Sequence, residues 1–419
     1  MLKSRWLIGL FALTFLVAAC AAPQVDVQSA SLEDASQGVE AASIPTNSPP
    51  VASAAEAEYE CGDPFNGEDT SFDVRHWEKT DFCQHSVEYS EIFSGGPPPD
   101  GIPPIDNPTF ETIESADNWL RDVEPIVLLA LEDDVRAYPL QIMTWHEIVN
   151  DTVNDVPVVV TFCPLCNTAL VFERFEHDGE LLTFGTSGNL RHSDLVMYDR
   201  QTQSWWQQFS GEGIVGSFTG TKLTPVPAAI ISWGDFKAKY PVGQVLSIDT
   251  GISRPYGQNP YVGYDNIDSY PFLFSGEIPD QLRPMDRVVG VVLDSGDAVA
   301  FAFTRLNEEV VINDVIGETN IVVFWKAGTA SALDTRDISS GADIGATGVY
   351  EATLDGEVLT FVDNDDGTFS DENTGSTWDI FGQAIAGALE GQSLRPINHH
   401  DTFWFAWAAF VPGDTLQEG

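Results

Sequence analysis

Apolar residues recur along this chain in short runs, and most runs have the length and composition of β-strands. Runs such as IVLLALE, VPVVVTF, RVVGVVL and NIVVFW are rich in β-branched and aromatic residues, and Gly, Asp, Asn or Pro bound them. Helical spacing is rare, and we expect helices only over 115–123, 378–389 and, as a turn or short helix, 142–150. The pattern predicts a mainly β fold with a few short helices, of the α+β class.

The segment 95–110, GGPPPDGIPPIDNPTF, interrupts this pattern. It contains six prolines in sixteen residues. Proline lacks the backbone N–H donor and blocks a helix interior, so a regular helix or a central strand is excluded here. We expect the region 59–119 to be an N-terminal, extended and Pro-rich strap that wraps across the body.

The pattern also repeats within the chain. The segment 127–170 matches 290–333 at a constant offset of 163 residues, and weaker matches continue downstream. Asn150-Asp151 falls on Asn313-Asp314, and Ala169-Leu170 falls on Ala332-Leu333. The repeat predicts an internal duplication that forms two pseudo-equivalent β-rich lobes, over 120–275 and 283–412. We expect both Asn-Asp pairs to stabilise a turn between two strands.

Three residues whose side chains could bind a metal ion or react occur in the first copy only. Cys163 falls on Lys326, Cys166 on Thr329 and His146 on Glu309. Residues shared by both copies are best explained by the fold, so the unshared ones are the best candidates for chemistry. Two cysteines and a histidine form a soft ligand set that suits zinc or copper. Weaker candidates for a further ligand are Met197, His192, His399 and His400.

The sequence leaves three functions open for the CPLC motif. The first is a metal site of Cys163, Cys166 and His146. The alternative for His146 is a buried histidine bonded to a backbone carbonyl, with Glu147 as a solvated neighbour. The second is a thiol–disulfide couple, in which one thiolate attacks and the other resolves. The third is a non-catalytic surface binding or scaffold protein, in which the motif is a structural disulfide or a buried thiol pair. Only the first requires a cofactor. Any chemistry should lie in the first lobe, with the second closing one wall of the pocket, through His399 or His400.

The N-terminal region has the features of an exported protein. Residues 1–20 carry Lys3 and Arg5 before an apolar run, and Val17-Ala18-Ala19-Cys20 resembles a bacterial lipobox, with Cys20 as the lipidated residue. Residues 21–58 are poor in aromatics and rich in Ala, Ser and Pro, which predicts a disordered tether. We therefore expect an exported, membrane-anchored lipoprotein. In an oxidising compartment, Cys61 and Cys83 would form a disulfide.

Charge narrows the range of partners. The chain has 64 acidic and 19 basic residues, a net charge of −45. Nucleic acid is excluded as a partner, because binding it requires clustered Lys and Arg. The remaining expectations are a membrane contacted through the lipid anchor and a small molecule or metal ion as ligand.

Long motifs of the chain resemble a known family. The segments VPVVVTFCPLCNTALVF, GTSGNLRHSDLVMYDRQTQSWWQQF and FWFAWAAF are similar to the domain of unknown function 3179, found in exported bacterial and archaeal proteins. The resemblance covers about residues 70–412, and no settled activity comes with it. Since it runs unbroken through the second motif, Asp199, Arg200 and Gln207 are candidates to line a pocket near the cysteines. Asn189 could belong to an anion-binding turn, and Asp194 could be an ion-paired scaffold residue.

Overall fold

The computed structural model describes residues 61–65, 67, 69–413 and 415–417. The expected signal peptide 1–20, the lipidation site Cys20 and the tether 21–58 lie outside these residues. Within the described part of the chain, no helix combines the length and apolar character needed to cross a membrane.

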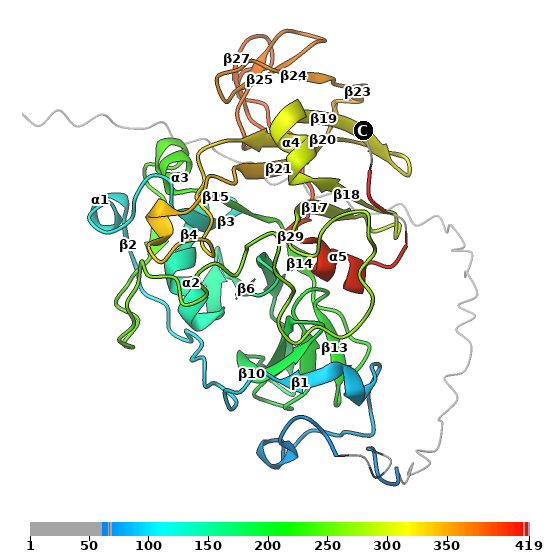
Figure 1. Cartoon of the computed structure of the whole chain (residues 1–419). Coiled ribbons are helices and arrows are strands. Elements are labelled where there is room, and N and C mark those ends of the chain that lie inside the picture. Colours follow the sequence, from blue (N-terminus) through cyan, green and yellow to red (C-terminus); the bar gives the residue numbers. More distant parts are fainter. Residues whose placement is uncertain (1–60, 66, 68, 414, 418–419) are drawn as a thin grey trace, which may run out of the picture. The chain divides into compact units, whose positions relative to one another are not determined.

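The described body is mainly β with short helices, as the sequence predicts, and its elements occur in two successive copies (Figure 1). The first copy contains β3 (Pro125–Leu131), β4 (Asp134–Pro139), α2 (Leu140–His146), β5 (Ile148–Val153), β6 (Val156–Cys163), β7 (Thr168–Glu173), β8 (Glu176–His177), β9 (Glu180–Leu181), β10 (Phe184–Arg191), β11 (Asp194–Asp199), β12 (Trp205–Gln207), β13 (Glu212–Val215), β14 (Pro225–Val226), β15 (Ala228–Ser232) and α3 (Trp233–Lys239).

The second copy repeats the same succession. It contains β17 (Arg287–Val292), β18 (Ala298–Ala302), α4 (Phe303–Glu309), β19 (Val311–Ile316), β20 (Thr319–Lys326), β21 (Ala346–Glu351), β22 (Thr353–Leu354), β23 (Glu357–Val358), β24 (Phe361–Asp363), β25 (Phe369–Asp371), β26 (Thr377–Trp378), β27 (Ala384–Ala386), β28 (Arg395–Pro396), β29 (His399–Phe403) and α5 (Trp404–Phe410). A short 3₁₀ helix, η3 (Ile338–Ser340), is inserted between β20 and β21.

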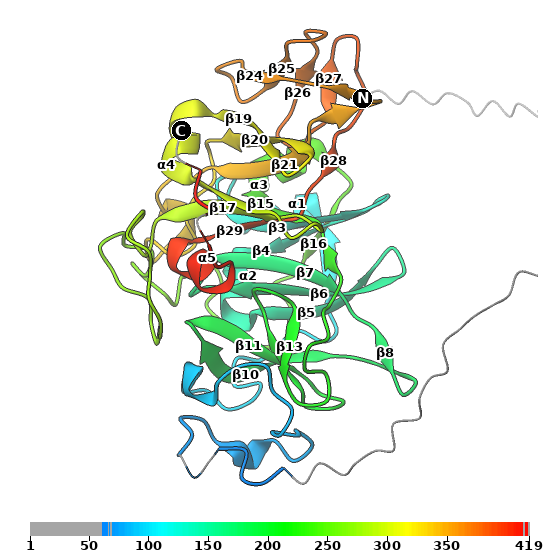
Figure 2. The ribbon, with the colours of Figure 1, turned by 90° about the vertical axis from the view of Figure 1, so that its right-hand side faces the viewer.

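Strand pairing confirms the internal duplication. Strands β3, β4 and β15 correspond to β17, β18 and β29; β5, β6, β7 and β14 correspond to β19, β20, β21 and β28; and β10–β13 correspond to β24–β27. The sheets stack on one another along the body (Figure 2). The two copies also contact each other reciprocally. Strand β7 of the first copy packs near β29 of the second. In the same way β21, the counterpart of β7, packs near β15, the counterpart of β29.

The expected helices are only partly present. Over 115–123 the structure has the short α1 (Ile113–Ala116), and over 142–150 it has α2, which ends before β5 begins. The prediction of a helix over 378–389 is wrong, because this segment forms the end of β26, a loop and β27. Gly382 and Gly387 have φ values of 68° and 99°. These left-handed conformations, which glycine adopts without steric cost, cannot continue a right-handed helix.

The repeated Asn-Asp pairs do not stabilise a turn, contrary to expectation, because they lie within strands β5 and β19. Asn150 Nδ2 donates to the carbonyl of Phe184 at 2.8 Å, and its Oδ1 accepts from the N–H of Phe184 at 2.9 Å. Asn313 makes the same two bonds with Phe361, both at 2.9 Å. Each asparagine therefore attaches one sheet of its copy to another sheet of the same copy, at the start of β10 in the first copy and of β24 in the second.

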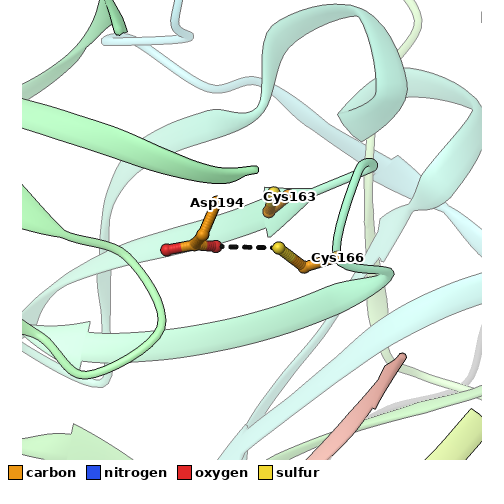
Figure 3. Close-up of side chains that lie close together, drawn as sticks. All are labelled: Cys163, Cys166 and Asp194. Atoms are coloured by element: carbon orange, nitrogen blue, oxygen red, sulfur yellow. Dashed lines mark hydrogen bonds between the residues drawn. The ribbon is translucent and has the colours of Figure 1, made fainter. Parts of the chain in front are cut away.

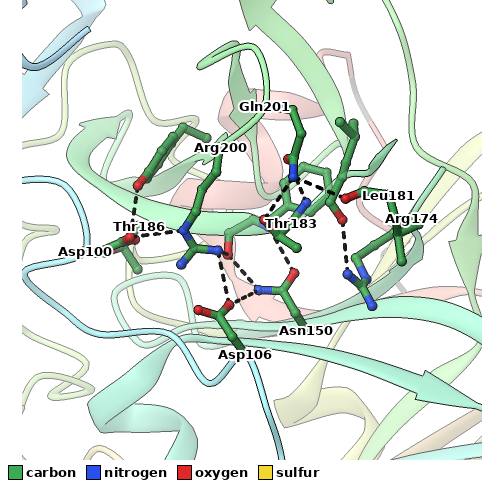
Figure 4. A network of polar contacts seen from close by, with 12 residues as sticks. Asp100, Asp106, Asn150, Arg174, Leu181, Thr183, Thr186, Arg200 and Gln201 are labelled. Atoms are coloured by element: carbon green, nitrogen blue, oxygen red, sulfur yellow. Dashed lines mark hydrogen bonds and ion pairs between the residues drawn. The ribbon is translucent and has the colours of Figure 1, made fainter. Parts of the chain in front are cut away.

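The N-terminal region 61–112 lies along the first copy. It contains η1 (Val74–His76), η2 (Tyr89–Glu91), β1 (Ile92–Ser94) and β2 (Phe110–Thr112), and β2 pairs with β16 (Gln244–Leu246). The expected disulfide between Cys61 and Cys83 is present. The Pro-rich segment contains no regular helix, and Arg200 holds it through Asp100 at 3.2 Å and Asp106 at 3.1 Å (Figure 4).

Candidate functional site

The two unshared cysteines lie on a tight turn between β6 and β7. Cys163 ends β6 and pairs with Thr168 at the start of β7. The N–H of Cys166 donates to the carbonyl of Cys163 at 3.2 Å, and Asn167 closes the turn with a φ of 55°. Asparagine tolerates this left-handed conformation better than most residues. Both thiols are free and buried, with exposed fractions of 1% and 0%.

A buried carboxylate completes this group. One ligand atom from each of Cys163, Cys166 and Asp194 lies within 4.8 Å of the other two (Figure 3). Asp194 begins β11, and its Oδ1 lies 3.2 Å from the sulfur of Cys166. Its Oδ2 accepts from Gln207 Nε2 at 2.5 Å and from the N–H of Phe209 at 3.0 Å. One carboxylate oxygen is thus anchored, while the other faces the thiols.

Glu147 is a fourth buried acid near this group. It caps α2 in a left-handed conformation with a φ of 59°, and its Oε1 accepts from the Tyr261 hydroxyl at 3.1 Å. Burial raises its pKa to about 8, and the Asp194 charge adds to this effect. Burial likewise raises the pKa of Asp194 to about 6.

Burial also raises the pKa of the Cys163 thiol, and it raises the pKa of the Cys166 thiol well above its usual value. Among the described residues, no lysine, arginine or histidine forms a hydrogen bond or ion pair with these four acids. A buried anion without a positive partner is strongly disfavoured. Without a cation, the two thiols and Glu147 are therefore mainly neutral at pH 7, whereas Asp194, with a pKa of about 6, is mainly ionised. A bound cation would supply the charge that stabilises the thiolates and the Asp194 carboxylate.

The structure does not bring His146 to the cysteines. Its Nδ1 lies 2.7 Å from the carbonyl of Pro103, and its Nε2 lies 2.6 Å from the Tyr256 hydroxyl. Both ring nitrogens are occupied by the strap and by the loop after β16. The third member of the group is therefore Asp194, and not His146 as the sequence predicted. His146 instead connects the Pro-rich segment to α2.

The weaker ligand candidates also have other surroundings. Met197 lies in the core opposite Trp206, and Phe369 occupies its place opposite Trp378 in the second copy. His192 Nδ1 contacts the carbonyl of Ser275. His399 Nδ1 lies 3.1 Å from the carbonyl of Ile397. The His400 ring stacks on Phe209 with centroids 4.6 Å apart, and burial lowers its pKa to about 3.

The four pocket candidates divide into two kinds. Gln207 holds Asp194, and Asn189 lines a cavity beside the cysteine turn. Arg200 instead holds the strap through its ion pairs (Figure 4). Asp199 accepts from Trp206 Nε1 at 3.0 Å, as Asp371 accepts from Trp378 Nε1 at 2.9 Å in the second copy. The repeated contact identifies Asp199 as a residue of the fold.

The expected anion-binding turn at Ser187-Gly188-Asn189 is a β-bulge in β10. Gly188 has a φ of 78°, and a side chain on it would meet the carbonyl of Pro97 at 1.9 Å. Glycine is therefore required for the strap to approach this strand. Bulges redirect neighbouring side chains, and here the bulge precedes Asn189.

The second copy has a different connection at the position of the cysteine turn. Four residues separate the paired Cys163 and Thr168, whereas nineteen separate the equivalent pair, Lys326 and Ala346. The predicted match of Cys166 to Thr329, and of Ala169-Leu170 to Ala332-Leu333, is therefore wrong. Those residues lie in the longer loop of the second copy.

The second copy nevertheless supports the cysteine turn. The Thr402 hydroxyl of β29 donates to the carbonyl of Cys166 at 3.0 Å, and the N–H of Phe403 donates to the same carbonyl at 3.0 Å. These contacts come from β29, but from different residues than the expected His399 and His400. Those two histidines line a separate cavity of about 720 Å³ between the copies.

Sequence reasoning missed Asp194 and Glu147 as residues of this group. It expected an ion-paired Asp194 and a solvated Glu147, whereas both are buried and neither forms an ion pair among the described residues. Asp199 of the first copy corresponds to Asp371 of the second, so Asp194 falls on Asp366, an exposed aspartate. Because both copies have an aspartate at this position, comparing the two sequences does not single out Asp194. Glu147 could have been found, because it falls on Val310 at the offset that aligns the asparagines. The same criterion that singled out His146 therefore applies to its neighbour.

Fold and site together define a duplicated β protein that contains a buried dithiol–carboxylate group. The chain belongs to the family described as Protein of unknown function (DUF3179), which it matches over residues 99–414. No curated protein and no solved structure matches it.

Proposed function

We propose that this chain is an exported, lipid-anchored protein that binds one zinc or copper ion through Cys163, Cys166 and Asp194. The observation that carries the proposal is a set of acidic groups buried without a positive partner. A divalent cation would neutralise two thiolates, while the Asp194 carboxylate would complete a mixed sulfur and oxygen ligand set.

The positions of the ligand atoms support this assignment. A tetrahedral ion with sulfur at about 2.3 Å and oxygen at about 2.0 Å separates those two atoms by roughly 3.5 Å. The sulfur of Cys166 and Oδ1 of Asp194 are 3.2 Å apart. Gln207 and the N–H of Phe209 hold the other oxygen, which is how outer partners orient a carboxylate ligand.

The ligand types favour zinc over copper. Zinc accepts thiolate and carboxylate oxygen together, whereas copper(I) prefers sulfur alone. The ligand set also fits the proposed compartment. Outside the cytoplasm two thiols this close would oxidise to a disulfide, and a bound metal ion would keep them reduced.

A thiol–disulfide function is the second candidate, because the sulfurs of a Cys-x-x-Cys turn lie within 4.8 Å of each other. Exchange requires an accessible thiolate. Cys163 and Cys166 are buried, and burial raises the pKa of both thiols. These two properties favour metal binding over exchange. In the scaffold alternative, the same cysteines would form a permanent disulfide.

The test is a zinc titration of the metal-free protein, reduced with a phosphine, followed by metal analysis after desalting. We expect one equivalent of bound zinc in the wild type, and at least a tenfold weaker affinity in Cys166→Ser and Asp194→Asn. His146→Gln should keep full binding. The matched control is Asp366→Asn, which removes an exposed aspartate from the corresponding hairpin of the second copy.

Each outcome decides between the candidates. Zinc binding lost in His146→Gln but kept in Asp194→Asn would restore the histidine ligand set. Failure of the folded, reduced wild type to bind zinc or copper(I) would reject a metal site. If the mass of the untreated protein then shows two disulfides, the scaffold or exchange function is favoured.

A further inference from the structure

A second feature of the first copy is a cavity of about 360 Å³ beside the cysteine turn. Its walls come from six separate segments, which include β10 and the C-terminal cap of α2. The strap contributes Pro97 and Ile102, the cysteine turn contributes Leu165, β11 contributes Leu195, and the loop after β16 contributes Tyr264 and Phe272. The volume lies in the range of small-molecule sites, about 300–1,000 Å³. These side chains make the cavity mainly apolar.

One polar side chain in this cavity has no partner. Asn189 has an exposed fraction of 5%, and its Nδ2 is buried without any hydrogen bond. An unpaired buried amide donor costs about 1–3 kcal/mol. The bulge that redirects β10 places this residue in the cavity wall. A ligand atom that accepts from Nδ2 would remove that cost.

A second polar position lies in the same cavity wall. Glu147 lines the cavity, and its Oε1 is occupied by the hydroxyl of Tyr261, which lines it as well. Two polar positions in a mainly apolar enclosure are typical of sites that fix the orientation of a small ligand.

We infer that this cavity binds a small, mainly apolar molecule with a carbonyl-type hydrogen-bond acceptor, which Asn189 Nδ2 engages. The site is distinct from the proposed metal ligands, since none of the three lines the cavity. Leu165 lies between the two cysteines in sequence and Leu195 follows Asp194, so a bound molecule would lie next to the dithiol–carboxylate group. Binding itself requires no metal, so this inference goes beyond the proposed function.

The experiment uses fluorine NMR on the metal-free, reduced protein, with para-fluoroacetophenone as the probe. Its matched analogue is para-fluoroisopropylbenzene, which has nearly the same shape but no acceptor. We expect the wild type to bind the ketone about tenfold more tightly, the effect of one satisfied buried hydrogen bond. Asn189→Leu should abolish this preference while retaining the apolar analogue. Asn307→Leu, at an exposed position on α4, is the control and should behave like the wild type.

A second variant locates the probe. Ile102→Trp places a large ring in the cavity and should abolish binding of both compounds. Binding that persists in a folded Ile102→Trp protein would place the probe elsewhere and overturn the inference. If Ile102→Trp does not fold, the Asn189 comparison decides alone. Equal binding of the two compounds by the wild type, binding of neither, or a preference that survives Asn189→Leu would also overturn it. Because zinc is absent throughout, failure here is distinguishable from failure of the metal proposal.

Discussion

The turn after β6 and the loop after β20 occupy the same position in two copies of one fold, yet they differ in almost every respect. The first is a tight turn that buries two thiols next to Asp194. The second is a long loop that begins beside Lys326, whose amine pairs with Asp235 on α3 of the first copy. One connection contributes two thiols to a buried dithiol–carboxylate group, and the other contributes an ion pair between the two copies.

This difference separates residues of the fold from residues of the site. Contacts present in both copies, such as Asn150 with Phe184 and Asn313 with Phe361, attach sheets to one another. Of the residues present in only one copy, the two cysteines and Glu147 lie at the dithiol–carboxylate group, whereas His146 contacts Pro103 and Tyr256 instead. A duplicated protein thus contains an internal control, in which one copy shows what the fold requires without the chemistry.

The largest loss of stability is expected when the asparagines shared by both copies are replaced, because they are residues of the fold. Asn150→Ala leaves buried backbone groups of Phe184 unpaired and should lower the free energy of unfolding by about 3 kcal/mol. Asn313 makes the same bonds but is exposed. Water can replace its side chain, so Asn313→Ala should cost about 1 kcal/mol. Urea unfolding measures both losses, with the exposed and unpartnered Asn307→Ala as control. No loss at either site would show that the repeated contact is incidental.

A smaller effect is expected from the unshared Glu147. Burial raises its pKa from 4.5 to about 8, so the folded protein retains a proton that the unfolded chain releases. Its stabilising contribution is complete below about pH 4.5 and is lost as the pH rises through 8. Between pH 6 and 8, the free energy of unfolding of the metal-free wild type should fall by about 2 kcal/mol through this group.

The substitution Glu147→Gln removes that titration. Chemical unfolding at pH 6, 7 and 8 should therefore show a flatter pH dependence in the variant. Glu308→Gln, at an exposed position of α4, is the control and should retain the wild-type slope. An unchanged slope in Glu147→Gln would mean that Glu147 is ionised in the folded protein, and the cluster would then contain an unrecognised positive partner.

The smallest effect is expected at Lys326. Its ion pair with Asp235 is partly exposed, and such pairs contribute roughly 0–1 kcal/mol. Lys326→Ala should leave the zinc content at the wild-type level and change the free energy of unfolding by less than about 1 kcal/mol. Metal analysis and urea unfolding of the same preparation check both values. Loss of zinc from a folded Lys326→Ala protein would mean that the site extends across the two copies.

Much of the fold was predictable because it depends on local patterns. Short β-branched runs predicted the strands, and the constant offset predicted the duplication. The matching failed after Cys163, where the second copy has a longer loop. Strand register, which only the folded chain reveals, shows that Thr329 is not the counterpart of Cys166. The helix expected over 378–389 failed for a related reason, because apolar spacing alone does not report the left-handed glycines.

The site was predictable only in part. The cysteines stood out because one copy lacks them. Asp194 lies on another sheet, and no sequence spacing relates β11 to the turn after β6. His146 was a reasonable ligand by residue type, but its two nitrogens contact Pro103 and Tyr256. Those contacts depend on the course of the strap and of the loop after β16, which sequence periodicity does not specify.

X-ray absorption at the zinc edge of the loaded, reduced protein tests most directly whether two cysteines and one aspartate of the first copy hold the metal ion. We predict two sulfur neighbours at about 2.3 Å and oxygen neighbours at about 2.0–2.2 Å, without the outer-ring scattering of a bound imidazole. Asp194→Asn should alter the oxygen shell and retain the sulfur shell. A spectrum with bound imidazole, or with no sulfur in the first shell, would contradict this ligand set.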